Sequence, residues 1–471
     1  MNRRYFIIGG LAGAASAHAL WASKAFSAPQ ESGMAGMDMN DAAQNSAGRI
    51  LTLPIGAPLP KMQTLKNLSS TPGAFEATIE ASPTEVEFAK NVQTHVLAYN
   101  KLVPGPLIDV TEGDKVRITF QNTIPEQDST IHWHGLPVPP DQDGSPADAV
   151  ASGKERVYEF TVPEGSAGSY WYHPHPHGRT AEQVYRGLAG AFIVRPKSDP
   201  LPASLGDTVL FISSLSLNSD GSIPKNTPAD QINGREGDHV LVNGAKEPVL
   251  DIVPGSSRRF RLYNASSARF LRLSVQKHTM TLVGTDGGLL GSPQGGLDEL
   301  LLAPAERAEV VIDFQQQSGR IAMISQPYER GWMGRGKPEA KTLTLMTFNL
   351  TGTPGQPTVL PPTLREIAAL PEPSGAQLVE IGEKMGMANG AMTMDFLLDG
   401  KSYAMGRRQT GKGRQRRTLG NRQQGRHGPS FPYSRRAISD GRARDGWQSH
   451  ACALPCVERF SEHQGGRNCP S

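Results

Sequence analysis

The chain has 471 residues, of which 37% are hydrophobic and 6% aromatic, with 51 Gly, 37 Pro, 3 Cys and a formal net charge of +3. This length allows two or three domains, and the high glycine and proline content favours short strands and turns over long helices. No Cys occurs before Cys452, which excludes a disulfide framework from the body of the protein.

Residues 1–28 indicate an export signal. Arg3–Arg4 precede a moderately apolar run that extends from Tyr5 to about Trp21 and is followed by small residues up to Ala28. This order is typical of a twin-arginine signal peptide. The apolar run is short and rich in Gly and Ala for a membrane span. We therefore expect export to the periplasm without a stable membrane anchor; an uncleaved anchor is the alternative.

Residues 29–49 are small and polar, and we expect them to be flexible. Met34, Met37 and Met39 lie in this segment. Thioethers are soft ligands for Cu(I), so these methionines either collect copper or occur there by chance.

From about 50 to 200, strand-like words alternate with Pro and Gly: THVLAYN, KVRITFQN, RVYEFTVP and GAFIVRP. The pattern predicts a Greek-key β-sandwich. A second unit, 205–352, has strands separated by the turns Asn243-Gly244 and Pro254-Gly255. Its later words, LLAPAERAEVVIDF, predict another strand pair. The fold class is therefore all-β, with tandem sandwich domains.

The front half contains two His-X-His pairs, His132-Trp-His134 and His173-Pro-His175. In a strand, side chains at i and i+2 leave the same face, with Cβ atoms about 6.5–7 Å apart. Two facing pairs would offer four imidazoles to one small volume. Imidazole binds Cu, Zn, Fe and Ni, and copper most tightly among these divalent ions. A zinc hydrolase is the alternative that the pairs alone leave open.

Residues 353–390 form a Pro- and Met-rich segment that we expect to be a linker, and a third unit begins at 391 and continues to 406. Two methionine pairs lie at this boundary: Met385, Met387, Met392 and Met394. They are candidate Cu(I) ligands, and an ordinary flexible loop is the competing interpretation.

The words IHWHG and YWYHPHPHGRTAEQVYRGLAGAFIV resemble the first cupredoxin domain of the multicopper oxidases, the laccase and cuprous oxidase family. The 205–352 unit resembles the copper-free middle domain of the same family. The resemblance implies three cupredoxin domains, copper as cofactor and a monomer. It also implies oxidation of a phenol, an amine or Cu(I), coupled to four-electron reduction of O₂ to water.

By that resemblance His132 is a type-2 copper ligand, while His134, His173 and His175 are type-3 ligands. Asp143 matches an acidic residue that the family keeps near the type-2 copper, where it supplies protons. A turn residue in Asp-Gln-Asp-Gly is the alternative for Asp143. In cuprous oxidases a methionine-rich segment near the third domain binds substrate copper.

After Gly406 the composition changes. Residues 407–471 contain 14 Lys and Arg against 4 Asp and Glu, together with all three Cys, and strand alternation disappears. A basic tail can bind nucleic acid or anionic lipid, but an exported oxidase has little use for either. A frameshift between about 406 and 418 explains the tail better. In the neighbouring frame, permitted codons for 427–435 encode MDHPFHTHG, which matches the family's third histidine motif, and those for 418–423 and 453–462 encode LWEIVN and PYRAWKDSVN.

A type-1 copper needs a Cys thiolate and two His ligands, and the family places that Cys in a final HCHxxxH motif. Cys452, Cys456 and Cys469 have no such surroundings. We therefore expect type-2 and type-3 sites that are partly present, absent type-1 ligands and no oxidase activity in the chain as written. The alternative function is a non-catalytic cupredoxin-fold protein that binds copper or acts as a scaffold.

Overall fold

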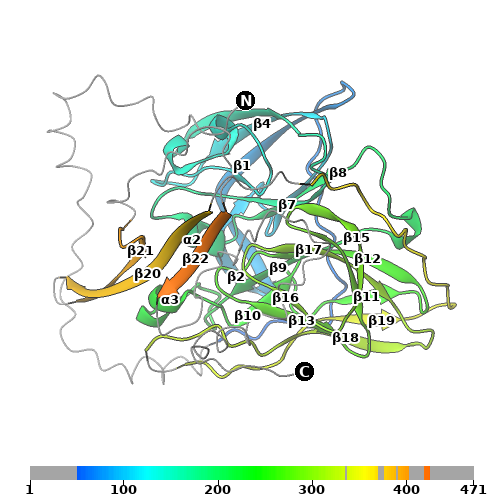
Figure 1. Cartoon of the computed structure of the whole chain (residues 1–471). Helices are drawn as coiled ribbons and strands as arrows, with labels where there is room; N and C mark the ends of the chain where they lie inside the picture. Colours follow the sequence, from blue (N-terminus) through cyan, green and yellow to red (C-terminus); the bar gives the residue numbers. More distant parts are fainter. Residues whose placement is uncertain (1–49, 335–336, 370–375, 389–390, 403–417, 425–471) are drawn as a thin grey trace, which may run out of the picture.

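A computed structural model describes residues 50–334, 337–369, 376–388, 391–402 and 418–424. These residues form five β-sheets, and they contain almost no helix (Figure 1). The all-β sandwich fold predicted from the sequence is confirmed. The helical pieces are α2 (Thr180–Tyr185), α3 (Pro228–Asn233), η1 (Pro140–Gln142), η2 (Pro146–Asp148) and η3 (Ala203–Leu205). Among the described helices, none is long and apolar enough to cross a membrane.

The first sandwich has two four-stranded sheets. One has the order β2 (Val92–Tyr99), β1 (Ala74–Ala89), β4 (Lys115–Asn122), β6 (Lys154–Thr161). The other has the order β3 (Gly105–Thr111), β8 (Gly190–Arg195), β7 (Gly168–His173), β5 (His132–His134). Apolar residues at alternate positions of both sheets, such as Ile79, Val116, Ile108 and Phe192, are buried in one core. Alternation of this kind is expected when each sheet buries one face.

The second sandwich has a six-stranded and a five-stranded sheet. The six-stranded sheet has the order β10 (His239–Val242), β9 (Thr208–Leu215), β12 (Ser257–Asn264), β17 (Arg307–Asp313), β14 (Met280–Thr285), β15 (Gly288–Leu297). The five-stranded sheet has the order β11 (Val249–Ile252), β19 (Leu343–Leu350), β18 (Gly319–Gln326), β13 (Leu271–Val275), β16 (Leu300–Leu302). The words LLAPAERAEVVIDF form two strands, β16 and β17, but the expected pairing between them is wrong. β16 pairs with β13 and β17 with β12, because the turn between them passes from one sheet to the other.

The two sandwiches pack directly on each other. Trp171 and Ile193 of the first are buried with Phe211 and Tyr263 of the second. The start of the described chain also joins them, because Ile50 pairs with Asn218 and residues 55 and 58 bridge to the second sandwich. The range 50–200 therefore does not belong wholly to the first domain. Nothing in the words ILTLPIG identifies a partner strand, so this placement could not be predicted locally.

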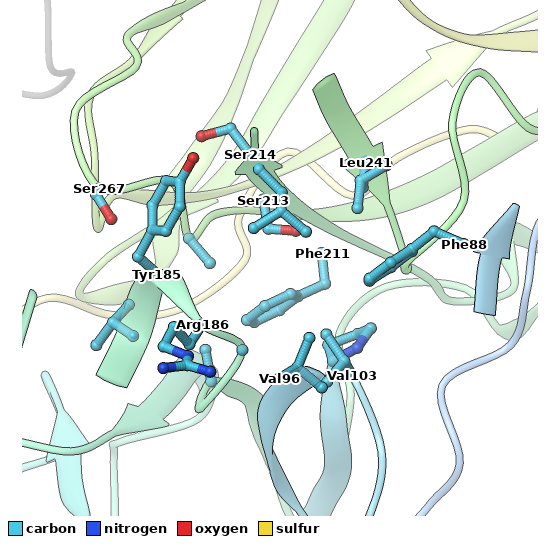
Figure 2. A pocket seen from close by; sticks show the side chains of 16 residues that line it. Phe88, Val96, Val103, Tyr185, Arg186, Phe211, Ser213, Ser214, Leu241 and Ser267 are labelled. Carbon is cyan, nitrogen blue, oxygen red and sulfur yellow. The ribbon is translucent and has the colours of Figure 1, made fainter. Parts of the chain in front are cut away.

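A small cavity lies in the interface between the sandwiches (Figure 2). Its volume is about 30 Å³, which is room for about one water molecule. Apolar side chains from both sandwiches, including Phe88, Val96 and Phe211, form one part of the wall, and Arg186 and Ser214 form another. None of the four predicted copper histidines lines it, so the cavity is not the metal site.

A third sheet has the order β21 (Ala391–Leu398), β20 (Ala376–Ala388), β22 (Thr418–Gln424) and stands at the edge of the molecule (Figure 1). Two expectations are corrected here. The linker does not extend to 390, because the Pro-rich composition ends near Pro373 and β20 begins at Ala376. Strand structure also does not end at 406, because β22 pairs in parallel with β20. Such pairing uses backbone groups, so a polar sequence can join the sheet.

Several predicted segments lie outside the described residues. These are the export signal over 1–28, the Met-containing segment over 29–49, and 407–417 and 425–471 of the basic tail.

Candidate metal centre

The four predicted copper histidines come from β5, β7 and the loop that follows β7. β5 and β7 are antiparallel, with His132 opposite His173 and His134 opposite Trp171. The intervening residues Trp133 and Tyr172 are buried in the core of the first sandwich. Because successive side chains of a strand point to opposite faces, the HWH and YWYH words place aromatic rings in the core and imidazoles together on the other face.

The imidazole rings form one cluster. The ring centroid of His132 lies 5.7 Å from that of His134 and 5.3 Å from those of His173 and His175. The centroids of His134 and His173 are 5.4 Å apart. The ligand nitrogens of His132, His134 and His173 lie within 4.8 Å of one another. His175 is held beside them, since its backbone N–H donates to Thr130 Oγ1 at 2.8 Å.

The hydrogen bonds of these rings leave nitrogens for a metal. Nδ1 of His132 donates to the Asp143 carbonyl oxygen at 2.8 Å, and Nδ1 of His173 donates to the Pro174 carbonyl oxygen at 2.8 Å. Both rings therefore turn Nε2 toward the cluster, an arrangement typical of metal-binding histidines. Nδ1 of His134 lies 3.1 Å from Nε2 of His173, and Nδ1 of His175 is buried without a hydrogen-bond partner. The donor set fits copper.

Asp143 lies beside the cluster in the loop between η1 and η2. Its Oδ1 is 3.2 Å from His132 Nδ1, and its side chain is 38% exposed. Gly144, the next residue, has φ +67°, and a side chain there would collide with the Ile131 carbonyl. The glycine thus lets the loop close on β5, and Asp143 contacts both His132 and solvent.

Burial favours the neutral form of His134, His173 and His175. It lowers the pKa of His173 to about 3, and the charge of His132 adds to the effect. Burial also lowers the pKa of His134 far below its usual value, helped by His173 and Arg307, and that of His175, helped by His132. A neutral imidazole is the form that binds metal, so the site is ready for a cation at neutral pH.

The metal-free protein is expected to lose stability as the pH falls from about 6.5 toward 3. The unfolded chain takes up a proton on each histidine near 6.5, whereas folded His173 resists protonation to about 3. His173 alone therefore costs about 1.4 kcal/mol per pH unit in this window. Urea unfolding of chelator-treated protein at pH 7 and pH 5 measures the loss. His173→Asn should reduce the slope; an unchanged slope would contradict the assignment.

Sequence reasoning missed two neighbours of the cluster. Trp171 packs on the imidazoles, with ring centroids 4.4 Å from His173 and 5.0 Å from His134. Its position two residues before His173 was the available signal, because i and i+2 share a strand face. Arg307, from the second sandwich, contacts β7 at Ser169, 138 residues away in sequence. No local pattern indicates such a contact.

Two further histidines and the four methionines lie away from the cluster. His278 contacts Gln276 and Gln315 by hydrogen bonds, and His239 is buried in β10; neither joins the cluster. The four methionine positions belong to β20 and β21 rather than to a loop. Their backbones are cross-strand partners, in the pairs Met385 with Met394 and Met387 with Met392.

Two tandem β-sandwiches, with two His-X-His words brought together by the pairing of β5 and β7, define a cupredoxin-type metalloprotein. Comparison with known proteins is in agreement. Sequence profiles described as multicopper oxidase match residues 80–199 and 214–350. The solved structure of a multicopper oxidase from Campylobacter jejuni, titled a metallo-oxidase, superposes with a TM-score of 0.69 at 40% identity. That match covers 75% of this chain and 76% of the other.

Two characterised relatives are also similar. The multicopper oxidase mco of Staphylococcus haemolyticus is 37% identical over 252 residues, which are 52% of this chain and 55% of that protein. A laccase of Bacillus subtilis is 31% identical over 303 residues, or 55% and 58% of the two chains. The chain thus spans a little over half the length of these relatives. It belongs to the multicopper oxidase family, whose cofactor is copper.

Proposed function

We propose that this protein is a copper-dependent oxidase that takes single electrons from a phenol, an amine or Cu(I) and reduces O₂ to water. The observation that carries the proposal is the convergence of the His132, His134, His173 and His175 rings from β5, β7 and the loop after β7. Bound copper supplies the redox chemistry, and the protein supplies geometry and protons.

The residues of the cluster and Asp143 have three roles in this proposal. His132 is the type-2 ligand, and its Nδ1 bond to the Asp143 carbonyl orients Nε2 toward the metal. His134, His173 and His175 are the type-3 ligands. The half-exposed Asp143 carboxylate takes protons from solvent and passes them toward the reduction of O₂.

The methionine hairpin favours Cu(I) as an electron donor over organic donors. The four methionine positions pair directly across β20 and β21, and positions that pair across a ladder share a face. Methionine thioethers suit a soft cation such as Cu(I). The hairpin is therefore proposed as the Cu(I) entry site.

The printed chain is proposed to be an inactive, frameshifted form of this oxidase. It carries no Cys flanked by the histidines that a type-1 copper requires, and the neighbouring frame permits the family's third histidine motif. The intact protein is proposed to be a monomer that the twin-arginine pathway exports to the periplasm. It is proposed to act without nucleic acid and without a stable membrane anchor. The Arg3–Arg4 start supports that route.

Replacement of both His132 and His175 by Ala is expected to abolish copper binding by the first domain. The two substitutions remove one ligand on each side of the cluster, and a site with half its imidazoles should hold copper too weakly for isolation. Copper per chain, measured after desalting, is the readout. His95→Ala is the matched control, since His95 is an exposed first-domain histidine beside Glu85. Unchanged stoichiometry in the double variant would show that the ligand assignment is wrong.

A further inference from the structure

One buried cation of the second sandwich reaches the strands that carry the metal ligands. Arg307 is the first residue of β17, and its side chain is only 4% exposed. Its Nε donates to the backbone carbonyl of Ser169 at 3.1 Å, and its guanidinium lies 6.0 Å from the ring centroid of Tyr170. Ser169 and Tyr170 belong to β7, just before His173.

The same guanidinium also packs against β5. Gly135 follows His134 directly and has φ +87°, and a Cβ at this position would collide with the Arg307 guanidinium. Only glycine therefore lets the chain turn away from β5 while the cation occupies this space. Arg307 thus touches the backbone beside both His-X-His words.

Arg307 is itself held rigidly. Its Nη1 pairs with Asp286 Oδ1 at 2.7 Å and donates to the Ala305 carbonyl at 3.0 Å. Its backbone N–H donates to Asp286 Oδ1 at 2.8 Å. A planar guanidinium with several fixed partners positions its contacts far better than an ammonium group would.

β5 needs such support. It is only three residues long and is the edge strand of its sheet, paired on one side with β7. A strand of this length held by one neighbour is weakly fixed. Yet its two histidines must stay within a fraction of an ångström of their place for a metal to bind well.

We propose that Arg307 is a positioning residue of the metal centre. From the neighbouring sandwich, its side chain fixes where β5 and β7 lie relative to each other. This inference rests on the proposed function, since it assumes that the histidine cluster binds copper. It assigns the copper-free second sandwich a direct part in building the copper site.

Cu²⁺ titration of the full chain tests the proposal, with EPR spectra and thermal unfolding of each variant. The signal that His173→Ala removes defines the cluster. Arg307→Lys keeps the charge but loses the planar fork, and Gly135→Ala displaces the guanidinium without changing it. The matched control is Arg330→Lys, because Arg330 is a similarly buried arginine, 7% exposed, whose ion pair is with Glu236.

Both test variants should lower the Cu²⁺ affinity of the cluster about 10–100-fold and change the copper hyperfine pattern, while Arg330→Lys leaves both as in wild type. Equal losses in Arg307→Lys and Arg330→Lys would show a general effect of stability and overturn the proposal. A Gly135→Ala variant that folds and keeps the wild-type affinity and spectrum would also overturn the proposal, even if Arg307→Lys failed to fold. A wild-type chain without a His173-dependent signal would instead refute the proposed function itself, and this inference with it.

Discussion

Shifting the reading frame near the codons for 406–418 to the proposed one is expected to turn the copper-loaded protein blue, whereas the printed chain should stay colourless. The blue absorption needs a Cys thiolate and two imidazoles on one copper. In the printed chain Cys452, Cys456 and Cys469 lie in a basic segment, and only His450 is near Cys452. The restored chain should also consume O₂ with a phenolic donor or Cu(I), with turnover on the order of 1–1,000 per second.

Visible absorption and O₂ uptake check this expectation after the gene is resequenced across the codons for 403–428. A restored chain that also carries His132→Ala is the control, since it should keep the blue copper but lose O₂ reduction. Blue colour in the printed chain would disprove the absence of type-1 ligands. A restored chain that stays colourless would mean that the proposed frame is wrong.

The metal cluster could be predicted from sequence because its geometry is local. His132 and His134, like His173 and His175, occupy alternate positions of extended chain, and alternation alone directs each pair to one side. The aromatic residues between and beside them, Trp133 and Tyr172, are the core-facing half of the same pattern. Only the antiparallel pairing of β5 with β7 had to be supplied by the fold.

Contacts between distant segments could not be read in this way. The segment that begins at Ile50 pairs with the second sandwich, although its sequence does not differ from that of other short apolar strands. Arg307 and Ser169 are in contact although 138 residues separate them in sequence. Nothing in the sequence around either residue indicates this contact. Such contacts depend on how the two sandwiches dock, which is a property of whole surfaces.

The third sheet shows a different limit. Proline content indicated a linker, but the linker ends before β20, which begins at Ala376. β22 lies in a segment whose polar composition gave no strand signal, yet it pairs along β20. Backbone hydrogen bonds do not depend on side-chain polarity, so composition alone could not exclude this strand.

The second large effect is expected at Glu309, where Glu309→Gln should lower the free energy of unfolding by about 3–5 kcal/mol. Glu309 is fully buried and accepts hydrogen bonds from Arg259 Nη2 at 2.5 Å and Arg261 Nη1 at 2.6 Å. Burial alone would raise its pKa, but the charges of Arg261 and Arg259 outweigh burial and lower it. A neutral amide would leave both guanidinium groups short of a buried negative charge.

Urea unfolding at pH 7 measures the loss. Glu299→Gln is the matched control, because Glu299 pairs with Arg272 at 2.6 Å on the surface, where both side chains are more than a third exposed; such pairs contribute about 0–1 kcal/mol. Similar small losses in both variants would contradict a dominant role for the buried carboxylate. Since the pKa of Glu309 is lowered on folding, its contribution is present above the ordinary glutamate pKa and is lost as the pH falls through the folded value.

The same substitution should disturb the first sandwich. Ser169 of β7 donates its hydroxyl to Glu309 Oε1 at 2.7 Å and accepts from Arg261 Nη1 at 2.9 Å. The buried charges of the second sandwich therefore end on the strand that carries His173. We expect calorimetry of the wild-type chain to show a single unfolding transition for the two sandwiches. Glu309→Gln should lower that single transition rather than split it, because the shared apolar interface around Trp171 and Phe211 remains. Two separate transitions in wild type would show that the buried ion pairs stabilise only their own domain.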